Sequence, residues 1–125
     1  MKRLEILYMK IADVLRQKDF ILALCSFLDD FRRSGGKYSM ICDEPDTKAA
    51  DRVNLCILAA VTHKLSNEYG LTIPEWASKD MYVMPSPVYS FDTKNTEYQR
   101  FLFETSPEEF ACRNIYFGAN AIERV

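Results

Sequence analysis

The chain has 125 residues, enough for one domain with a single continuous core. Its 16 basic and 18 acidic side chains give a formal net charge of −2, which argues against the basic surface of a nucleic-acid-binding domain. The longest apolar run, residues 55–61, is far shorter than the ~18 residues that span a bilayer. Charges at Glu5, Lys10 and Asp13 interrupt any signal peptide, so we expect a cytoplasmic protein without a membrane segment.

The amino-terminal third predicts two helices and a loop. Residues 1–17 repeat apolar side chains at three- and four-residue intervals, which is typical of an amphipathic helix. Asp19 is placed to cap a second helix that ends at Gly35-Gly36. Its expected buried stripe is Phe20, Leu24, Phe27, Leu28 and Phe31. Residues 37–44 could form an extended piece, but a lone strand has no partner, so we predict a loop.

Residues 46–69 predict the longest helix, with Pro45 in its first turn, Asp43 or Glu44 as cap, and Gly70 as its end. This segment is apolar nearly all round, and such a helix is usually central and buried. The side chains that carry the pattern are Val53, Leu55, Cys56, Ile57, Leu58, Ala59, Ala60, Val61 and Leu65. We expect this helix to form the centre of the core.

The carboxy-terminal half predicts shorter elements around a long connection. Pro74 begins a short helical turn that carries Trp76. Residues 79–96 connect it to a helix over 95–105, and their many aromatic and apolar side chains argue against disorder. In that helix we expect Tyr98, Phe101 and Leu102 to face inward. Residues 106–109 (SPEE) match a capping box that begins a last helix, which runs to about residue 113. The fold predicted for residues 1–125 is a single all-α domain of five or six helices.

Catalytic and metal-binding patterns are absent from the sequence. The single histidine, His63, has no HExxH context and no second histidine, so a structural role is favoured over catalysis. The adjacent acids at 29–30 and 43–46 are typical of solvated helix positions. Four cysteines lack the paired spacing of a zinc site and are expected to be free and mostly buried. Neither a catalytic residue, a metal ligand nor a cofactor is predicted.

Two motifs in the second half carry a resemblance. Gly-Leu-x-x-Pro-x-Trp occurs at 70–76, and Ser-Pro-x-x-Phe-x-x-Arg-Asn-Ile occurs at 106–115. With the alanine-rich helix before them, they resemble a group of small, largely uncharacterised bacterial helical domains over residues 50–125. Members of that group sometimes lie near toxin–antitoxin or mobile-element genes, and no activity is attached to it. The resemblance implies that Arg113 and Asn114 belong to a shared architecture.

Two interpretations of Arg113-Asn114 follow. Arg113 can bond carbonyls or a carboxylate while Asn114 closes the short helix in a left-handed conformation, which releases Ile115 and Phe117 into the core. Alternatively, a binding groove forms, because such residue types are favoured at interfaces. Its expected residues are Trp76, Tyr82, Arg113, Asn114 and Tyr116. The function expected is a non-enzymatic protein-interaction module, with a regulator or antitoxin-like role beside another protein; the alternative is a small nuclease or hydrolase that uses His63 with nearby carboxylates.

Overall fold

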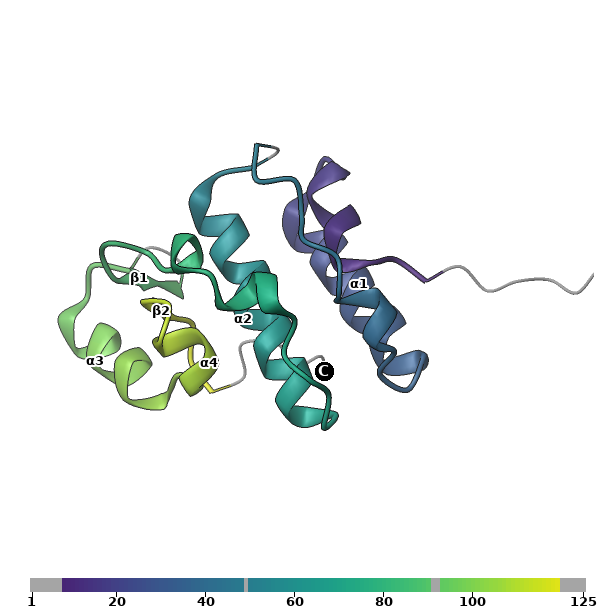
Figure 1. Ribbon diagram of the computed structural model, residues 1–125. Coiled ribbons are helices and arrows are strands. Elements are labelled where there is room, and N and C mark those ends of the chain that lie inside the picture. The colour runs from purple at the N-terminus through teal and green to yellow at the C-terminus, as the bar shows by residue number, and fades with distance from the viewer. Residues whose placement is uncertain (1–7, 49, 91–92, 120–125) are drawn as a thin grey trace, which may run out of the picture.

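The computed structural model describes residues 8–48, 50–90 and 93–119, and it confirms the all-α class. The α-helices are α1 (Phe20–Arg33), α2 (Arg52–Glu68), α3 (Thr96–Thr105) and α4 (Glu108–Ala111). The short 3-10 helices are η1 (Ile11–Arg16), η2 (Tyr38–Met40), η3 (Glu75–Ser78) and η4 (Asp80–Tyr82). Two short strands, β1 (Val88–Tyr89) and β2 (Ile115–Tyr116), pair in parallel. In Figure 1, α1 and α3 lie at opposite ends of the molecule with α2 between them.

Helix α2 is the buried centre, as its apolar pattern predicts. Every residue from Leu55 to Thr62 is buried, and so are Leu65 and Ser66. The helix ends as expected: Gly70 adopts a left-handed φ of 65°, and the Leu71 amide donates to the Ser66 carbonyl at 2.8 Å. Elements α4, η3 and η4 pack against α2, which therefore organises the whole second half.

The predicted start of this helix is wrong. Helix α2 begins at Arg52 after Asp51, not at residue 46. Residues 46–51 offer no large apolar side chain to the core, and the Asp46 carboxylate accepts from the Lys48 amide at 3.0 Å in a local turn. Aspartate side chains compete with the helix in this way, so residues 46–48 form a turn outside the helix.

Helix α1 follows its sequence signals. The Asp19 carboxylate accepts from the Leu22 amide at 3.1 Å, which is the predicted cap. The Gly36 amide donates to the Phe31 carbonyl at 3.1 Å, so the glycine pair ends the helix. Four residues of the expected stripe are buried; they are Leu24, Phe27, Leu28 and Phe31.

Where a helix over 1–17 was predicted, the described residues form only the short 3-10 helix η1. Residues 1–7 lie outside the described part of the chain, and 8–10 are not helical. Ile11 and Val14 are fully buried, and their three-residue spacing fits the three residues per turn of η1. The Met9 amide donates to the Asp30 carboxylate at 3.0 Å, which ties the entering chain to α1 in a non-helical conformation.

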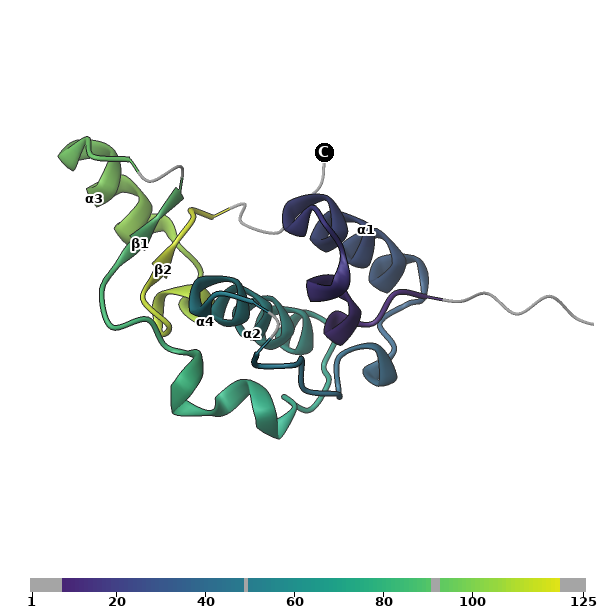
Figure 2. The ribbon, with the colours of Figure 1, turned by 90° about the horizontal axis from the view of Figure 1, so that it is seen from above.

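Helix α3 is present, but its orientation differs from the prediction. Leu102 is buried, whereas Tyr98 is 41% and Phe101 56% exposed, so the expected inward set was wrong for both aromatic residues. The helix projects from the end of the molecule beside the β1–β2 pair and packs mainly against β2 (Figure 2). One narrow strip of α3 is therefore covered.

The predicted capping box at 106–109 does not form. The Ser106 hydroxyl donates to the Leu102 carbonyl at 2.5 Å and accepts from the Gly118 amide at 3.0 Å. Ser106 thus closes α3 instead of opening α4, and it ties α3 to the segment after β2. Pro107 directly precedes α4, which ends at Ala111, earlier than expected.

The two strands were not predicted. Val88 is paired with Ile115 and Tyr89 with Tyr116, across 27 residues of sequence. The Met84 amide donates to the Arg113 carbonyl at 3.0 Å and the Val88 amide to the Asn114 carbonyl at 2.9 Å. Residues 84–89 of the long connection are held in place because they bond to the chain that follows α4.

Candidate functional site

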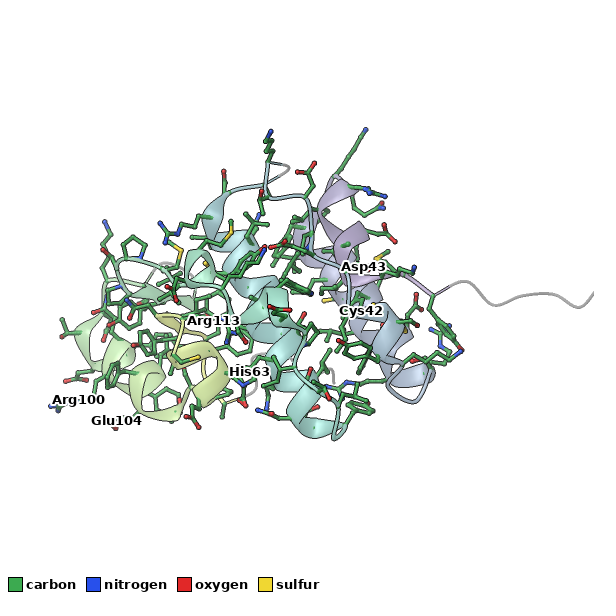
Figure 3. The ribbon with its side chains drawn as sticks, in the orientation of Figure 1. Cys42, Asp43, His63, Arg100, Glu104 and Arg113 are labelled. Atoms are coloured by element: carbon green, nitrogen blue, oxygen red, sulfur yellow. The ribbon has the colours of Figure 1, made fainter. Side chains whose placement is uncertain are left out.

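Arg113 is a buried anchor between three elements. Its side chain is 5% exposed. The guanidinium donates to the Glu109 carbonyl of α4 and to the Ala77 carbonyl of η3, each at 2.7 Å. It also lies 2.9 Å from Nδ1 of His63 on α2 (Figure 3). The predicted bonding of carbonyls is confirmed, and the side chain holds α4 and η3 against α2.

His63 completes this anchor. A guanidinium can only donate, so Nδ1 of His63 is the acceptor and the neutral ring carries its proton on Nε2. Burial lowers the pKa of His63, and the positive charge of Arg113 lowers it further. Within the described ranges no carboxylate bonds to the imidazole, and the nearby Glu109 carboxylate accepts instead from Asn67 at 3.2 Å. The ring is thus a neutral acceptor inside the structure.

Asn114 makes the turn that the left-handed interpretation predicts. Its φ is 65°, a conformation that asparagine tolerates better than most residues. Its side-chain Nδ2 donates to the Met84 carbonyl at 3.0 Å, and its side-chain Oδ1 accepts from the Tyr116 hydroxyl at 3.2 Å. The turn directs Ile115 into the core, where it is fully buried.

The other two residues of the predicted groove lie elsewhere. Trp76 and Tyr82 are buried and pack edge to face, with ring centroids 5.4 Å apart. The Trp76 indole donates to the Ile41 carbonyl at 3.0 Å, and the Tyr82 hydroxyl donates to the Glu44 carboxylate. The Tyr82 hydrogen bond lowers the pKa of Glu44. Both side chains therefore hold the 41–44 segment on the core. The indole N–H of Trp76 and the hydroxyl of Tyr82 are already bonded to that segment.

The side chains of the five predicted groove residues thus form two clusters, which the Arg113–Ala77 hydrogen bond links through η3. Arg113, Asn114 and Tyr116 meet at the turn after α4, while Trp76 and Tyr82 meet under residues 41–44. The structure does not bring the two clusters together around one open groove.

A different aromatic surface, which the sequence prediction missed, lies on α3. We call Tyr98 and Phe101 on one flank of this helix, together with Phe103 on the other, the α3 aromatic surface; Phe103 is 58% exposed. The rings of Tyr98 and Phe101 stack at 6.2 Å on one flank of the helix. The apolar residues 98, 101, 102 and 103 spread over an arc of α3 that is too wide to be covered by packing on one side of the helix. This sequence pattern could therefore have predicted exposed aromatic side chains.

The other flank of α3 borders a hollow. The Phe103 ring packs on Tyr116 at 4.9 Å, and Tyr116 stacks on Tyr89 of β1 at 5.6 Å. Beside them lies a surface hollow of about 490 Å³, which we call the β1–α3 hollow. Its lining residues are Tyr89, Thr96, Gln99, Arg100, Phe103 and Glu104. Figure 3 shows Arg100 and Glu104 at the outer end of the molecule, away from His63 and Arg113.

The described residues show no metal centre. In ranges 8–48, 50–90 and 93–119, no group of three histidine, cysteine or acidic side chains could hold an ion. All four cysteines are free; Cys56 is buried, but Cys112 is exposed, and Cys25 and Cys42 are half-buried, so the expectation of mostly buried thiols was wrong. No helix in the described part of the chain is both long and apolar enough to span a bilayer.

Comparisons with protein-family models, with curated proteins and with solved structures found no match for this chain.

Proposed function

We propose that this chain is a non-enzymatic protein-interaction module that binds its partner through the α3 aromatic surface. The observation that carries the proposal is the exposure of two stacked rings, Tyr98 and Phe101, on one flank of the ten-residue helix α3, with Phe103 exposed on the other flank. Exposed aromatic clusters on a monomer mark interaction sites, because their burial supplies the free energy of association. Tyrosine and phenylalanine are also enriched in interfaces relative to the rest of the surface.

The environment of His63 supports a non-enzymatic role over a nuclease or hydrolase. A general base needs an available nitrogen and, as a rule, a group that orients the ring. Nδ1 of His63 already accepts from Arg113, an arginine that bonds two structural carbonyls. The lowered pKa also disfavours the protonated ring that general-acid catalysis would need at pH 7.

The class of partner follows from the charge and from the resemblance. With a net charge of −2, the chain is suited to another protein and not to a nucleic acid. We place it in the cytoplasm as a regulator or antitoxin-like protein from a mobile or defence-linked locus, a role that rests on the resemblance of residues 50–125.

The test is a binding measurement with proteins encoded by neighbouring genes. The purified full chain, a Phe101→Asp variant and a Leu22→Asp variant are titrated against each candidate by calorimetry. Leu22 is a matched control, because it is 65% exposed but lies on α1. We expect Phe101→Asp to weaken binding about 30-fold, a typical hot-spot loss, and Leu22→Asp to leave it within about threefold.

Two results would overturn the proposal. One is a genuine partner whose affinity is unchanged in the Phe101→Asp variant. The other is a biological activity that disappears in a normally folded His63→Ala variant while partner binding stays intact, which would favour the enzyme instead.

A further inference from the structure

Among the described residues β1 pairs only with β2, which leaves its other edge unpaired beside the β1–α3 hollow. The Val88 amide donates to the Asn114 carbonyl, so the backbone amide and carbonyl of Val88 face β2. Peptide groups alternate sides along a strand, so the amide and carbonyl of Tyr89 face away from β2. In the part of the chain that the structure describes, neither group of Tyr89 has a hydrogen-bond partner on that side. An unpaired strand edge of this kind can accept another extended chain.

The length of this edge is limited to one residue. Pro87 precedes Val88 and lacks the amide that would extend the pairing. In an antiparallel pair, however, one residue exchanges both hydrogen bonds with the residue opposite it. Tyr89 alone can therefore form two bonds to a single residue of an incoming strand.

The hollow gives that incoming residue a place for its side chain. Two residues opposite each other in a pair project to the same face of the sheet. Tyr89 projects its ring toward Tyr116 and lines the hollow with Phe103. A residue paired with Tyr89 would thus present its side chain to the hollow, where aromatic walls favour an aliphatic or aromatic group.

The charges on the rim of the hollow and the exposed area around it indicate which kind of molecule can bind there. Arg100 and Glu104 stand 3.9 Å apart on the rim, 81% and 66% exposed, so the rim offers one charge of each sign and matches a segment without excess charge. The three residues of the α3 aromatic surface expose on the order of 300 Å². A stable dimer buries about 800 Å² on each partner, so this small surface fits a transient complex with a short segment better than a stable dimer of two copies.

We propose that the β1–α3 hollow binds an extended, uncharged segment of a partner protein, which pairs with Tyr89 as an added strand and places an apolar side chain against Phe103. This inference rests on the proposed function and specifies the kind of partner. A folded partner also covers Phe101 on the opposite flank of α3, whereas the segment by itself reaches only the hollow.

The test uses a display library of random linear peptides, selected on the intact chain, and synthetic copies of the enriched peptides. We expect these peptides to bind the Leu22→Asp variant, whose change lies on α1, as they bind the unaltered chain. Binding should weaken at least about tenfold in Phe103→Asp, which loses a wall, and in Thr96→Trp, which fills the hollow and leaves the Phe103–Tyr116 contact in place. Thermal melts confirm that each variant is folded.

A second measurement addresses the added strand. Methylation of the peptide amide that pairs with Tyr89 removes its hydrogen, so it should weaken binding at least about tenfold. Absence of enriched peptides, equal binding to both hollow variants, or indifference to methylation would overturn the inference. A partner that depends on Phe101 while no peptide binds would leave the proposed function standing and reject only the extended segment.

Discussion

Replacing Arg113 tests whether the turn after α4 is held by this buried side chain. Arg113→Met keeps much of the aliphatic stem and removes the guanidinium, which donates to the carbonyls of Glu109 and Ala77. Hydrogen bonds from charged groups contribute about 1.5–3 kcal/mol each. In the variant the Ala77 carbonyl also loses its hydrogen-bond donor, and no described backbone amide replaces it. Part of that loss is offset because burial itself lowers the pKa of Arg113, a sign that the charge is costly to bury.

The expected net cost is about 3 kcal/mol in the free energy of unfolding. For a chain of this size that corresponds to a fall in Tm on the order of 10 °C. Urea denaturation followed by circular dichroism gives the free energy directly, and a thermal melt gives the Tm. The matched control is Arg100→Met, because Arg100 is 81% exposed and its loss should change stability by less than about 0.5 kcal/mol.

An Arg113→Met variant as stable as Arg100→Met would refute this reasoning. If such a variant also lost its partner, Arg113 would belong to a binding surface, as the groove interpretation holds. Loss of stability with partner affinity intact at low temperature would instead support the anchor.

Two further substitutions test neighbouring parts of the structure. Burial and Arg113 lower the pKa of His63 in the folded chain, so below pH 6.5 the unfolded chain binds more protons than the folded one. The free energy of unfolding, measured by urea denaturation, should therefore fall as the pH drops below 6.5. The His63→Gln variant should lose this component of the pH profile. Gly36→Ala should cost about 1–3 kcal/mol more than Gly35→Ala in the same assay. Both glycines have positive φ, but only at Gly36 would a Cβ lie 2.3 Å from the Tyr69 ring; equal losses would contradict this.

Local sequence signals account for the features that were predicted correctly. Asp19 and Gly36 bond backbone groups within a few residues of themselves, so the ends of α1 follow from residue type alone. The all-round apolar pattern of α2 requires burial whatever surrounds it. Asparagine is one of the few residue types that tolerate a left-handed turn, so the turn at Asn114 could also be predicted from the sequence.

Features that depend on distant partners were not predictable in the same way. A strand of two residues, such as Val88–Tyr89, is too short for an alternating pattern, and its partner lies 27 residues away. The start of α2 was misplaced because Asp43, Pro45 and Asp51 are all acceptable helix-start residues. Only tertiary packing, which buries the helix side chains from Leu55 onward, selects among them.

The α3 aromatic surface shows the same limit from the functional side. Tyr98, Phe101 and Leu102 have the spacing of a buried stripe, and sequence alone cannot say which of them the domain covers. Ser106 decides it, because its bonds to Leu102 and to Gly118 place Leu102 against the segment after β2. The aromatic flanks then remain outside, where they supply the surface on which the proposed function rests.

The last prediction concerns the carboxy terminus. Truncation after Cys112 removes β2, in which Ile115 is fully buried and Tyr116 nearly so, together with the half-buried Phe117. Full burial of such a side chain contributes about 1.5–3 kcal/mol, so the loss is on the order of 5 kcal/mol, before the bonds of the deleted arginine are counted. Small domains have about 5–15 kcal/mol in total, so we expect no cooperative thermal transition. Truncation after Ala119 is the control, since it keeps every contact named here and reports what residues 120–125 add. A cooperative melt within a few degrees of the full chain after the longer truncation would show that β2 does not hold the second half together.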